Sequence, residues 1–283
     1  MTTAPLKLGL VGDNIAKSQA PRLHRLAGRQ NGVAVQYDRL IPKEEEVEFD
    51  PLFAGLEAAG YRGVNVTYPY KERAAARVAI DDPLVRAIGA VNTVIFDDDG
   101  PHGFNTDYTG FIAAYRRVRG QVDPGVTCMI GAGGVGKAVA FGLVALGAPE
   151  IRIIDHDLPK AEALCAALIA ARPGLVARAG SEATAGATGA KGLINCTPVG
   201  MVGYGGTPLP RTAMAGAEWV FDAVYTPIDT PFLQDAAAEG LAVITGYELF
   251  LGQGVDAWAI FTGLPLDEVR LRADLEAGEE VEA

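Results

Sequence analysis

The chain has 283 residues, of which 49% are hydrophobic and 21% charged, and its 35 acidic and 24 basic residues give a net charge of −11. This composition excludes a disordered chain, and the acidic balance argues against nucleic acid or an anionic membrane as a partner. There is no run of about 18 apolar residues, so we expect no membrane span. The three cysteines are scattered, which predicts neither a disulfide framework nor a metal site and favours a cytoplasmic location.

Short β-branched or apolar runs alternate with Ala- and Leu-rich helical patterns along the chain. This alternation predicts an α/β protein with parallel sheets covered by helices. The predicted strands are residues 6–11, 34–40, 63–67, 92–96, 127–130, 151–154, 193–195, 219–221 and 242–244. The predicted helices are residues 21–30, 107–117, 136–146, 160–170 and 231–239, followed by one more after Gly246.

Residues 131–136 read Gly-Ala-Gly-Gly-Val-Gly between a predicted strand and a predicted helix, which is the context of a dinucleotide-binding turn. Gly131 permits the tight turn and Gly133 lets the backbone approach a pyrophosphate. Gly136 lets the helix pack closely, with its N-terminus toward the phosphates. The predicted nucleotide-binding turn is therefore Gly131, Ala132, Gly133, Gly134, Val135 and Gly136.

Asp155 follows the next predicted strand, about 20 residues after Gly136, where an acidic side chain accepts hydrogen bonds from the adenosine ribose hydroxyls. A carboxylate at this position would repel a 2′-phosphate, and no arginine follows to bind one. The sequence therefore favours NAD over NADP. The alternative is that Asp155 is an ordinary turn residue.

Two further residues could take part in proton transfer. Lys71 lies just after Pro69 at the predicted start of a helix, where the helix dipole disfavours a cation and so favours proton transfer near neutral pH. The segment 105–107 reads Asn-Thr-Asp and opens another helix, where all three residue types are also good capping residues. Taken alone, Lys71 could be a surface lysine and Asp107 part of a helix cap.

Several motifs, in order, resemble the shikimate/quinate dehydrogenase family over nearly the whole chain. They are Gly12, Ser18, Pro21 and His24, then residues 65–71, 89–93, 105–107, 195–201 and 222–227, and finally Gly246 with Gln253. The resemblance implies two domains flanking a cleft: an N-terminal α/β substrate domain (residues 1–110 with 246–283) and a Rossmann dinucleotide-binding domain (residues 111–245). It also implies a monomer or homodimer.

The activity that the resemblance implies is reversible NAD(P)-dependent hydride transfer, without a metal, at a ring hydroxyl of shikimate, giving 3-dehydroshikimate, or of quinate. Lys71 and Asp107 would be the catalytic pair: Lys71 exchanges the hydroxyl proton, while Asp107 holds the same hydroxyl and orients the lysine. The residues that would bind ring hydroxyls are Thr67, Asn92 and Gln253, and those that would bind the carboxylate are Ser18 and Tyr225. Further nucleotide contacts would come from Thr197, Met201, Val224 and Gly246.

One position departs from the family pattern. The family usually has Ser-x-Ser or Ser-x-Thr before the proline, with both hydroxyls on the substrate carboxylate, whereas residues 18–21 here read Ser-Gln-Ala-Pro. A hydrogen bond to a charged group is worth about 1.5–3 kcal/mol. Either the usual substrates bind weakly, or a related cyclic acid such as aminoshikimate is preferred. Because Pro21 suits the first helical position, we also predict that Ala20 is the N-cap.

Two other functions remain open. A methylenetetrahydrofolate dehydrogenase shares the two-domain plan and a lysine near the nucleotide domain, but Ser18 and the Asn-Thr-Asp segment argue against it. A nucleotide-binding sensor without turnover would need neither Lys71 nor Asp107.

Overall fold

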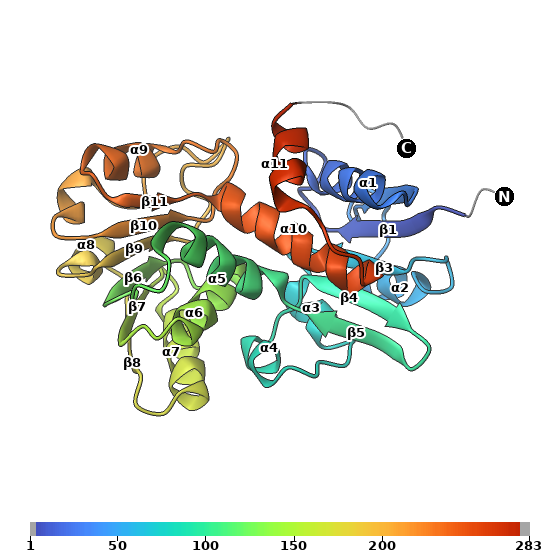
Figure 1. Cartoon of the computed structure of the whole chain (residues 1–283). Coiled ribbons are helices and arrows are strands. Elements are labelled where there is room, and N and C mark those ends of the chain that lie inside the picture. The colour runs from blue at the N-terminus through green and yellow to red at the C-terminus, as the bar shows by residue number, and fades with distance from the viewer. Residues whose placement is uncertain (1–3, 278–283) are drawn as a thin grey trace. The chain divides into compact units, whose positions relative to one another are not determined.

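The computed structural model describes residues 4–277 and divides the chain into two compact units. One unit holds the described residues up to Thr106 together with those from Gln253 onward, and the other is Asp107–Gly252. Each unit is built on its own β-sheet (Figure 1). The first boundary falls at the start of α5 (Thr106–Arg119), and the second falls inside α10 (Gly246–Thr262).

The first unit has a five-stranded sheet in the order β2-β1-β3-β4-β5. The strands are β1 (Leu6–Val11), β2 (Val35–Leu40), β3 (Gly63–Val66), β4 (Thr93–Asp97) and β5 (Gly100–Phe104). The first three pair in parallel, but β4 is antiparallel to both β3 and β5. The expectation of purely parallel sheets is therefore wrong for this unit. β4 and β5 form a hairpin, which needs no crossover helix.

The sequence pattern missed β5, because glycine and proline are depleted in strands and this one contains Gly100, Pro101 and Gly103. β5 lies at the edge of the sheet, where a proline without an N–H is tolerated.

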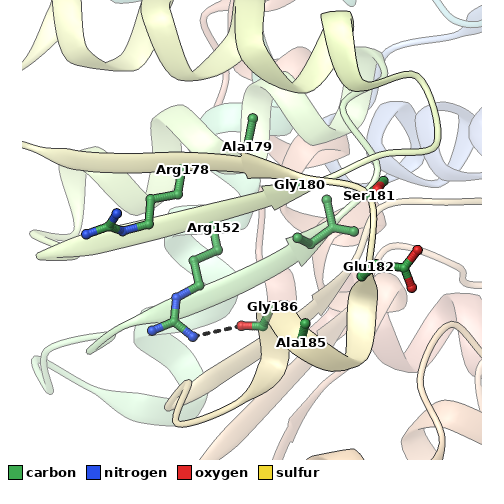
Figure 2. Close-up of a pocket in the computed structure, with 9 residues that line it drawn as sticks. Arg152, Arg178, Ala179, Gly180, Ser181, Glu182, Ala185 and Gly186 are labelled. Carbon is green, nitrogen blue, oxygen red and sulfur yellow. Dashed lines mark hydrogen bonds between the residues drawn. The ribbon is translucent and has the colours of Figure 1, made fainter.

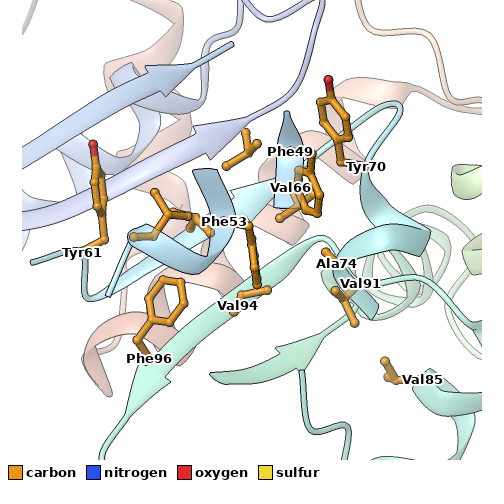
Figure 3. Close-up of a cluster of buried hydrophobic side chains, with 13 residues drawn as sticks. Phe49, Phe53, Tyr61, Val66, Tyr70, Ala74, Val85, Val91, Val94 and Phe96 are labelled. Atoms are coloured by element: carbon orange, nitrogen blue, oxygen red, sulfur yellow. The ribbon is translucent and has the colours of Figure 1, made fainter. Parts of the chain in front are cut away.

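Helices and buried side chains cover both faces of this sheet. The helices are α1 (Ala20–Asn31), α2 (Phe49–Gly55), α3 (Lys71–Ala75), α4 (Pro83–Ile88) and the end of α10. A further helix, α11 (Glu268–Glu276), packs on α1. One core cluster contains Val11 and the aromatic side chains of α2 (Figure 3). The other contains Leu10 and Trp258 of α10. Leu10 and Val11 belong to different clusters because successive strand residues point to opposite faces.

The second unit has a six-stranded, fully parallel sheet in the order β11-β10-β9-β6-β7-β8. The strands are β6 (Thr127–Ile130), β7 (Glu150–Ile154), β8 (Val176–Gly180), β9 (Gly192–Asn195), β10 (Trp219–Asp222) and β11 (Ala242–Ile244). The chain winds outward from β6 to β8, returns to β9 and winds outward again to β11. This is the Rossmann strand order, so the predicted α/β fold class with a Rossmann domain is confirmed. The edge strand β8 was missed by the sequence pattern because its side chains are half-buried or exposed.

The helices of this unit are α5, α6 (Gly134–Ala145), α7 (Leu158–Ala171), α8 (Ala183–Ala187), a 3-10 helix at Arg211–Met214, α9 (Pro231–Ala238) and the start of α10. α5 packs on the sheet through Phe111, whose ring meets Phe221 of β10 edge-on at a centroid distance of 5.0 Å. Throughout residues 4–277, no helix has the length and apolar character to span a membrane.

His24 is a buried polar residue in the core of the first unit. Its side chain is only 1% exposed, and its ring stacks on Tyr37 with centroids 5.0 Å apart. Burial lowers the pKa of His24 to about 4, although a hydrogen bond to Asn65 works in the opposite direction. The imidazole is therefore neutral in the folded protein over most of the pH range.

Protonation of His24 should make the fold less stable in mild acid. The unfolded chain binds a proton on this residue below pH 6.5, whereas the folded chain does so only near pH 4. The contribution of neutral His24 to the free energy of unfolding is thus fully present above pH 6.5. As the pH falls, the free energy of unfolding decreases by about 3 kcal/mol in total. Urea unfolding at several pH values should show this loss in the wild type and not in His24→Gln.

Leu26→Ala gives the control, because Leu26 is a fully buried residue of the same helix and carries no titratable group. It should lower the stability at every pH and keep the pH dependence of the wild type. If His24→Gln also kept it, the proton would be bound elsewhere and the explanation would be wrong.

Candidate active site

The glycine turn lies between β6 and α6, at the point where the order of the strands reverses. Gly131 has a φ of 102°, and a Cβ there would lie 2.7 Å from the carbonyl oxygen of Cys196, so only glycine fits. A Cβ at Gly136 would collide with the carbonyl oxygen of Gly131. A Cβ at Gly133, by contrast, would meet no described atom within 4 Å. Gly133 therefore borders open space at the N-terminus of α6, as a bound pyrophosphate requires.

The helix α6 starts at Gly134 with Gly133 as its N-cap, two residues earlier than the sequence pattern predicted. Three backbone amides of the turn, those of Gly134, Val135 and Gly136, therefore belong to the first helical turn, where N–H groups have no partner within the helix. The residues present fit a dinucleotide.

Asp155 follows β7 and its carboxylate faces the glycine turn. Oδ2 accepts a hydrogen bond from the backbone N of Ala132 at 2.7 Å, and Oδ1 accepts one from the backbone N of Asp157 at 2.9 Å. Oδ1 also lies 3.2 Å from Nδ1 of the exposed His156. Oδ2 can accept a second hydrogen bond, so Asp155 can hold the turn and still receive a ribose hydroxyl. The next lysine along the chain, Lys160, is paired with Asp157 at 3.1 Å.

A buried polar network holds the loops that follow β9 and β10. The Asp222 carboxylate accepts hydrogen bonds from Asn195 Nδ2 at 2.9 Å and from the backbone N of Val224 at 3.0 Å. It also accepts one from the hydroxyl of Thr230 at 2.6 Å. Asn195 Oδ1 accepts from the backbone N of Thr197 at 3.0 Å and from its hydroxyl at 2.6 Å. One network thus fixes two predicted nucleotide contacts, Thr197 and Val224.

Sequence reasoning quoted the motifs of Asn195 and Asp222 but gave these two residues no role. Both are fully buried. Burial raises the pKa of Asp222, while the three donors oppose that shift. One sequence signal could have identified both residues: each is a polar side chain at the carboxyl end of an apolar strand. Ligand-binding loops of parallel sheets begin at such positions.

The other predicted residues of this unit lie on the same loops or at helix starts. Tyr225 follows β10, and its ring stacks on Phe250 at a centroid distance of 5.2 Å. A Cβ at Gly246 would lie 2.7 Å from the carbonyl oxygen of Ala223, so α10 begins against the β10 loop. Met201 lies in the β9 loop and is 37% exposed.

Asp107 lies in the first turn of α5 and is 8% exposed. Burial first, and then the charges of Asp222 and Asp107, raise the pKa of the Cys196 thiol well above its ordinary value. The negative charge of Asp107 is therefore felt by Cys196, which lies in the same β9 loop that Asn195 holds.

In the first unit, three predicted residues gather near the end of β3 and the start of β4. Thr67 directly follows β3, and its backbone N donates to Val11 O at 2.9 Å. Lys71 is the first residue of α3, and its carbonyl oxygen accepts from the backbone N of Val91 at 3.1 Å. Asn92 comes next in the chain and is 4% exposed.

The Asn92 side chain is held by its oxygen alone. Oδ1 accepts from the backbone N of Thr106 at 2.7 Å and from the hydroxyls of Thr106 and Thr93 at 3.1 and 3.2 Å. Its Nδ2 has no hydrogen-bond partner among the described residues. Asn92 can therefore offer two N–H donors to a ligand without giving up its place in the fold.

The helix α1 corrects one prediction: it begins at Ala20 with Gln19 as its N-cap, so Ala20 is not the N-cap. The reason is local. The Ser18 hydroxyl oxygen accepts a hydrogen bond from the backbone N of Ala20 at 3.2 Å, and this turn starts the helix one residue earlier. The Ser18 hydroxyl proton stays available for a carboxylate.

Gln253 is the residue at which α10 enters the first unit. A Cβ on the neighbouring Gly254 would lie 2.5 Å from Leu23 Cδ1, so this part of α10 packs closely on α1. The first unit therefore places Gln253 beside the helix that follows Ser18.

A pocket between β7, β8 and α8 contains none of the predicted site residues (Figure 2). Its most prominent cation is Arg152, whose Nη1 donates to the carbonyl oxygens of Gly186 at 2.8 Å and Thr188 at 2.6 Å. Its Nε donates to Glu150 at 2.8 Å. Arg152 thus closes the end of α8 instead of facing a ligand. Within residues 4–277, no three side chains of metal-binding type gather.

Comparison with known proteins gives consistent matches. The family model described as the shikimate dehydrogenase substrate binding domain matches residues 10–94. Quinate/shikimate dehydrogenase (NAD(+)) of Corynebacterium efficiens is 37% identical over 277 residues, which cover 94% of this chain and 96% of that protein.

Two solved structures are similar over almost their full length. Quinate dehydrogenase from Corynebacterium glutamicum in complex with NAD has a TM-score of 0.89 at 31% identity, covering 96% of this chain and 99% of that one. Shikimate 5-dehydrogenase from Thermus thermophilus in complex with NADP(H) and shikimate has a TM-score of 0.83 at 32% identity, with the same coverage.

The Asp222 network should be a large contributor to stability. Asp222→Ala leaves three buried donors without their acceptor, and each unsatisfied group costs about 1–3 kcal/mol. We expect a loss of about 3 kcal/mol or more in the free energy of unfolding, measured by urea titration. Asp123→Ala is the control, because Asp123 is exposed and accepts one bond, from the backbone N of Gly125. Equal losses in the two variants would show that the network adds little.

Proposed function

This chain belongs to the shikimate/quinate dehydrogenase family, and on that premise we propose that it transfers a hydride reversibly between a nicotinamide and a ring hydroxyl of shikimate or quinate, with NAD preferred. It is an NAD(P)-dependent oxidoreductase. The observation that carries the proposal is the pairing of two features: the dinucleotide turn with open space at Gly133, and the cluster of Thr67, Lys71 and Asn92.

The proposed chemistry needs one proton transfer by the protein. The nicotinamide ring, when bound, accepts the hydride in the oxidation direction. Lys71 takes the proton of the reacting hydroxyl as the C–H bond breaks and the carbonyl forms, and it returns that proton in the reverse direction. Asp107 accepts a hydrogen bond from the same hydroxyl and orients Lys71. This scheme assigns no step to a metal.

The remaining substrate contacts are those that the family resemblance implies. Asn92 Nδ2, Thr67 and Gln253 bind ring hydroxyls. The Ser18 hydroxyl donates a hydrogen bond to the substrate carboxylate, and Tyr225 contacts the same carboxylate. Ala20 supplies no hydroxyl, so the carboxylate receives one hydrogen bond fewer than in the usual family pattern. Aminoshikimate is therefore the alternative substrate.

The nucleotide contacts proposed for the second unit are the turn 131–136, Asp155, and the loop residues Thr197, Met201, Val224 and Gly246. NAD is favoured because the Asp155 carboxylate would lie against a 2′-phosphate, and Lys160 is already paired with Asp157. The pKa of Asp157 is lowered chiefly by its hydrogen bond with Lys160, so this aspartate stays charged and keeps Lys160 paired.

We also propose a cytoplasmic location and a monomer or homodimer. The three cysteines are free and buried, which suits a reducing compartment. The net charge of −11 disfavours nucleic acid as a partner.

A spectrophotometric panel tests the proposed function. NAD and NADP are each crossed with shikimate, quinate and aminoshikimate. We expect turnover of shikimate or quinate with a kcat/KM at least about tenfold higher for NAD, since like charges placed together at an interface cost several kcal/mol and about 1.4 kcal/mol already corresponds to a factor of ten. Asp155→Asn removes the charge and keeps one oxygen as the acceptor for Ala132 N, although its amide cannot also accept from Asp157 N. It should therefore reduce the difference in kcat/KM between NAD and NADP.

Asp123→Asn, a substitution of the same kind on an exposed aspartate of the same unit, should leave the cofactor ratio unchanged. Equal efficiency of the wild type with NAD and NADP would contradict the role given to Asp155. Turnover of aminoshikimate alone would replace the proposed substrate, and turnover of none of the three acids would refute the proposal.

Lys71→Ala should lower kcat by a factor of about 100 or more, because general acid–base groups contribute about 10²–10⁴-fold. The Kd for NAD, measured by titration of the ligand, should change little, since Lys71 belongs to the other unit. Lys43→Ala, at an exposed lysine of the same unit, is the control and should keep the wild-type kcat. A loss below about tenfold in Lys71→Ala would exclude Lys71 as the proton-transfer group.

A further inference from the structure

Two loops of the first unit carry most of its proposed substrate contacts. The loop after β1 leads to Ser18, and the loop after β3 carries Thr67 and ends at Lys71. Contacts between these loops therefore set the position of Ser18, the proposed carboxylate contact, relative to Lys71, the proposed proton-transfer group. Both must be correctly placed to act on one bound substrate.

Asp13 joins the two loops by two hydrogen bonds. Its backbone N donates to the carbonyl oxygen of Tyr68 at 3.2 Å, and its carboxylate Oδ1 accepts from the Tyr70 hydroxyl at 2.7 Å. The loops also touch beside this point, because a Cβ on Gly12 would collide with the Thr67 side chain. The two loops are thus closely packed around Asp13.

Tyr70 is held from three sides. Its backbone N donates to the carbonyl oxygen of Thr67 at 2.9 Å, and it is the N-cap of α3. Its ring is 7% exposed and stacks on Phe49 at a centroid distance of 4.7 Å with 9° between the planes (Figure 3). Because Tyr70 directly precedes Lys71, whatever fixes Tyr70 also fixes the backbone from which the lysine side chain extends.

The hydrogen bond lasts over the pH range in which the enzyme would be assayed. Burial first, and then the hydrogen bond to Asp13, raise the pKa of Tyr70 to about 12. The hydroxyl therefore remains a donor, and a charge-assisted bond to a carboxylate is stronger than a neutral one.

We propose that the hydrogen bond between Tyr70 and Asp13 is a positioning contact, which holds the Ser18 loop against the loop of Thr67 and Lys71 in the arrangement that binds and oxidises the cyclic acid. This inference rests on the proposed function. Neither residue touches the reacting atoms in this account. A loss of position of about 1 Å can cost about 100-fold in rate, so one hydrogen bond that touches no reacting atom can still matter.

The same unit offers a matched control. Tyr61 belongs to the same core cluster as Tyr70, is 9% exposed, and donates its hydroxyl to Asp38 Oδ2 at 2.8 Å. Figure 3 shows Tyr61 and Tyr70 at opposite ends of the cluster. The two tyrosine–aspartate pairs have the same chemistry, but the partner Asp38 lies on β2, where it pairs with Gly9 of β1.

The test compares Tyr70→Phe with Tyr61→Phe. We expect similar falls in Tm, because each variant loses one hydroxyl–carboxylate bond. Tyr70→Phe should lower kcat/KM for shikimate or quinate by about 10- to 100-fold with an unchanged KM for NAD. Tyr61→Phe should stay close to the wild-type kcat/KM. Asp13→Asn, whose amide oxygen still accepts the hydrogen bond, should retain most of the activity, whereas Asp13→Ala should resemble Tyr70→Phe.

The double variant Tyr70→Phe with Asp13→Ala separates the hydrogen bond from other effects. It should lose no more kcat/KM than the single variants, because one bond cannot be lost twice. The inference is overturned if Tyr70→Phe affects kcat/KM no more than Tyr61→Phe does, or if the losses of the two single variants multiply. A wild-type protein without turnover of either acid refutes the proposed function itself, whatever the variants do.

Discussion

The buried carboxylate of Asp222 is the interaction on which the loops of the Rossmann unit depend. A charge without solvent is tolerated only where several donors surround it, and here Asn195, Val224 and Thr230 supply them. These donors come from the ends of two neighbouring strands and the start of α9. The hydrogen bonds to this one carboxylate therefore fix the loops on which the proposed nucleotide contacts Thr197 and Val224 lie.

The first unit uses the same means with neutral groups. Asn65 Nδ2 donates to Thr93 Oγ1 at 3.0 Å, Thr93 donates to Asn92, and Asn92 accepts from Thr106. In both units, side chains that we propose as ligand contacts are held by buried polar groups. A satisfied polar network tolerates one geometry only, whereas apolar packing tolerates several, so these networks suit a site that must hold its shape.

Much of the fold could be predicted from local patterns. The alternation of apolar runs and helical segments predicted most strands and the α/β class, and the glycine turn at 131–136 predicted the strand–turn–helix that is observed. The misses have physical causes. β5 contains glycines and a proline that are tolerated only at a sheet edge, and β8 is an edge strand with little buried surface. The start of α1 was misplaced because the Ser18 hydroxyl, and not a residue at position 20, organises the turn.

The sequence by itself determined the chemistry that is available: a glycine turn, an acidic residue after the second Rossmann strand, and the order of the family motifs. These features depend on neighbouring residues, so they can be read locally. Only the tertiary structure decided which polar groups are used up inside the fold and which remain for a ligand. Asn92 Oδ1 is committed to Thr106, Asp155 holds Ala132, and Asp13 meets Tyr70 although 57 positions separate them in the chain. Such pairings depend on which strands become neighbours, and no local pattern of residues encodes that.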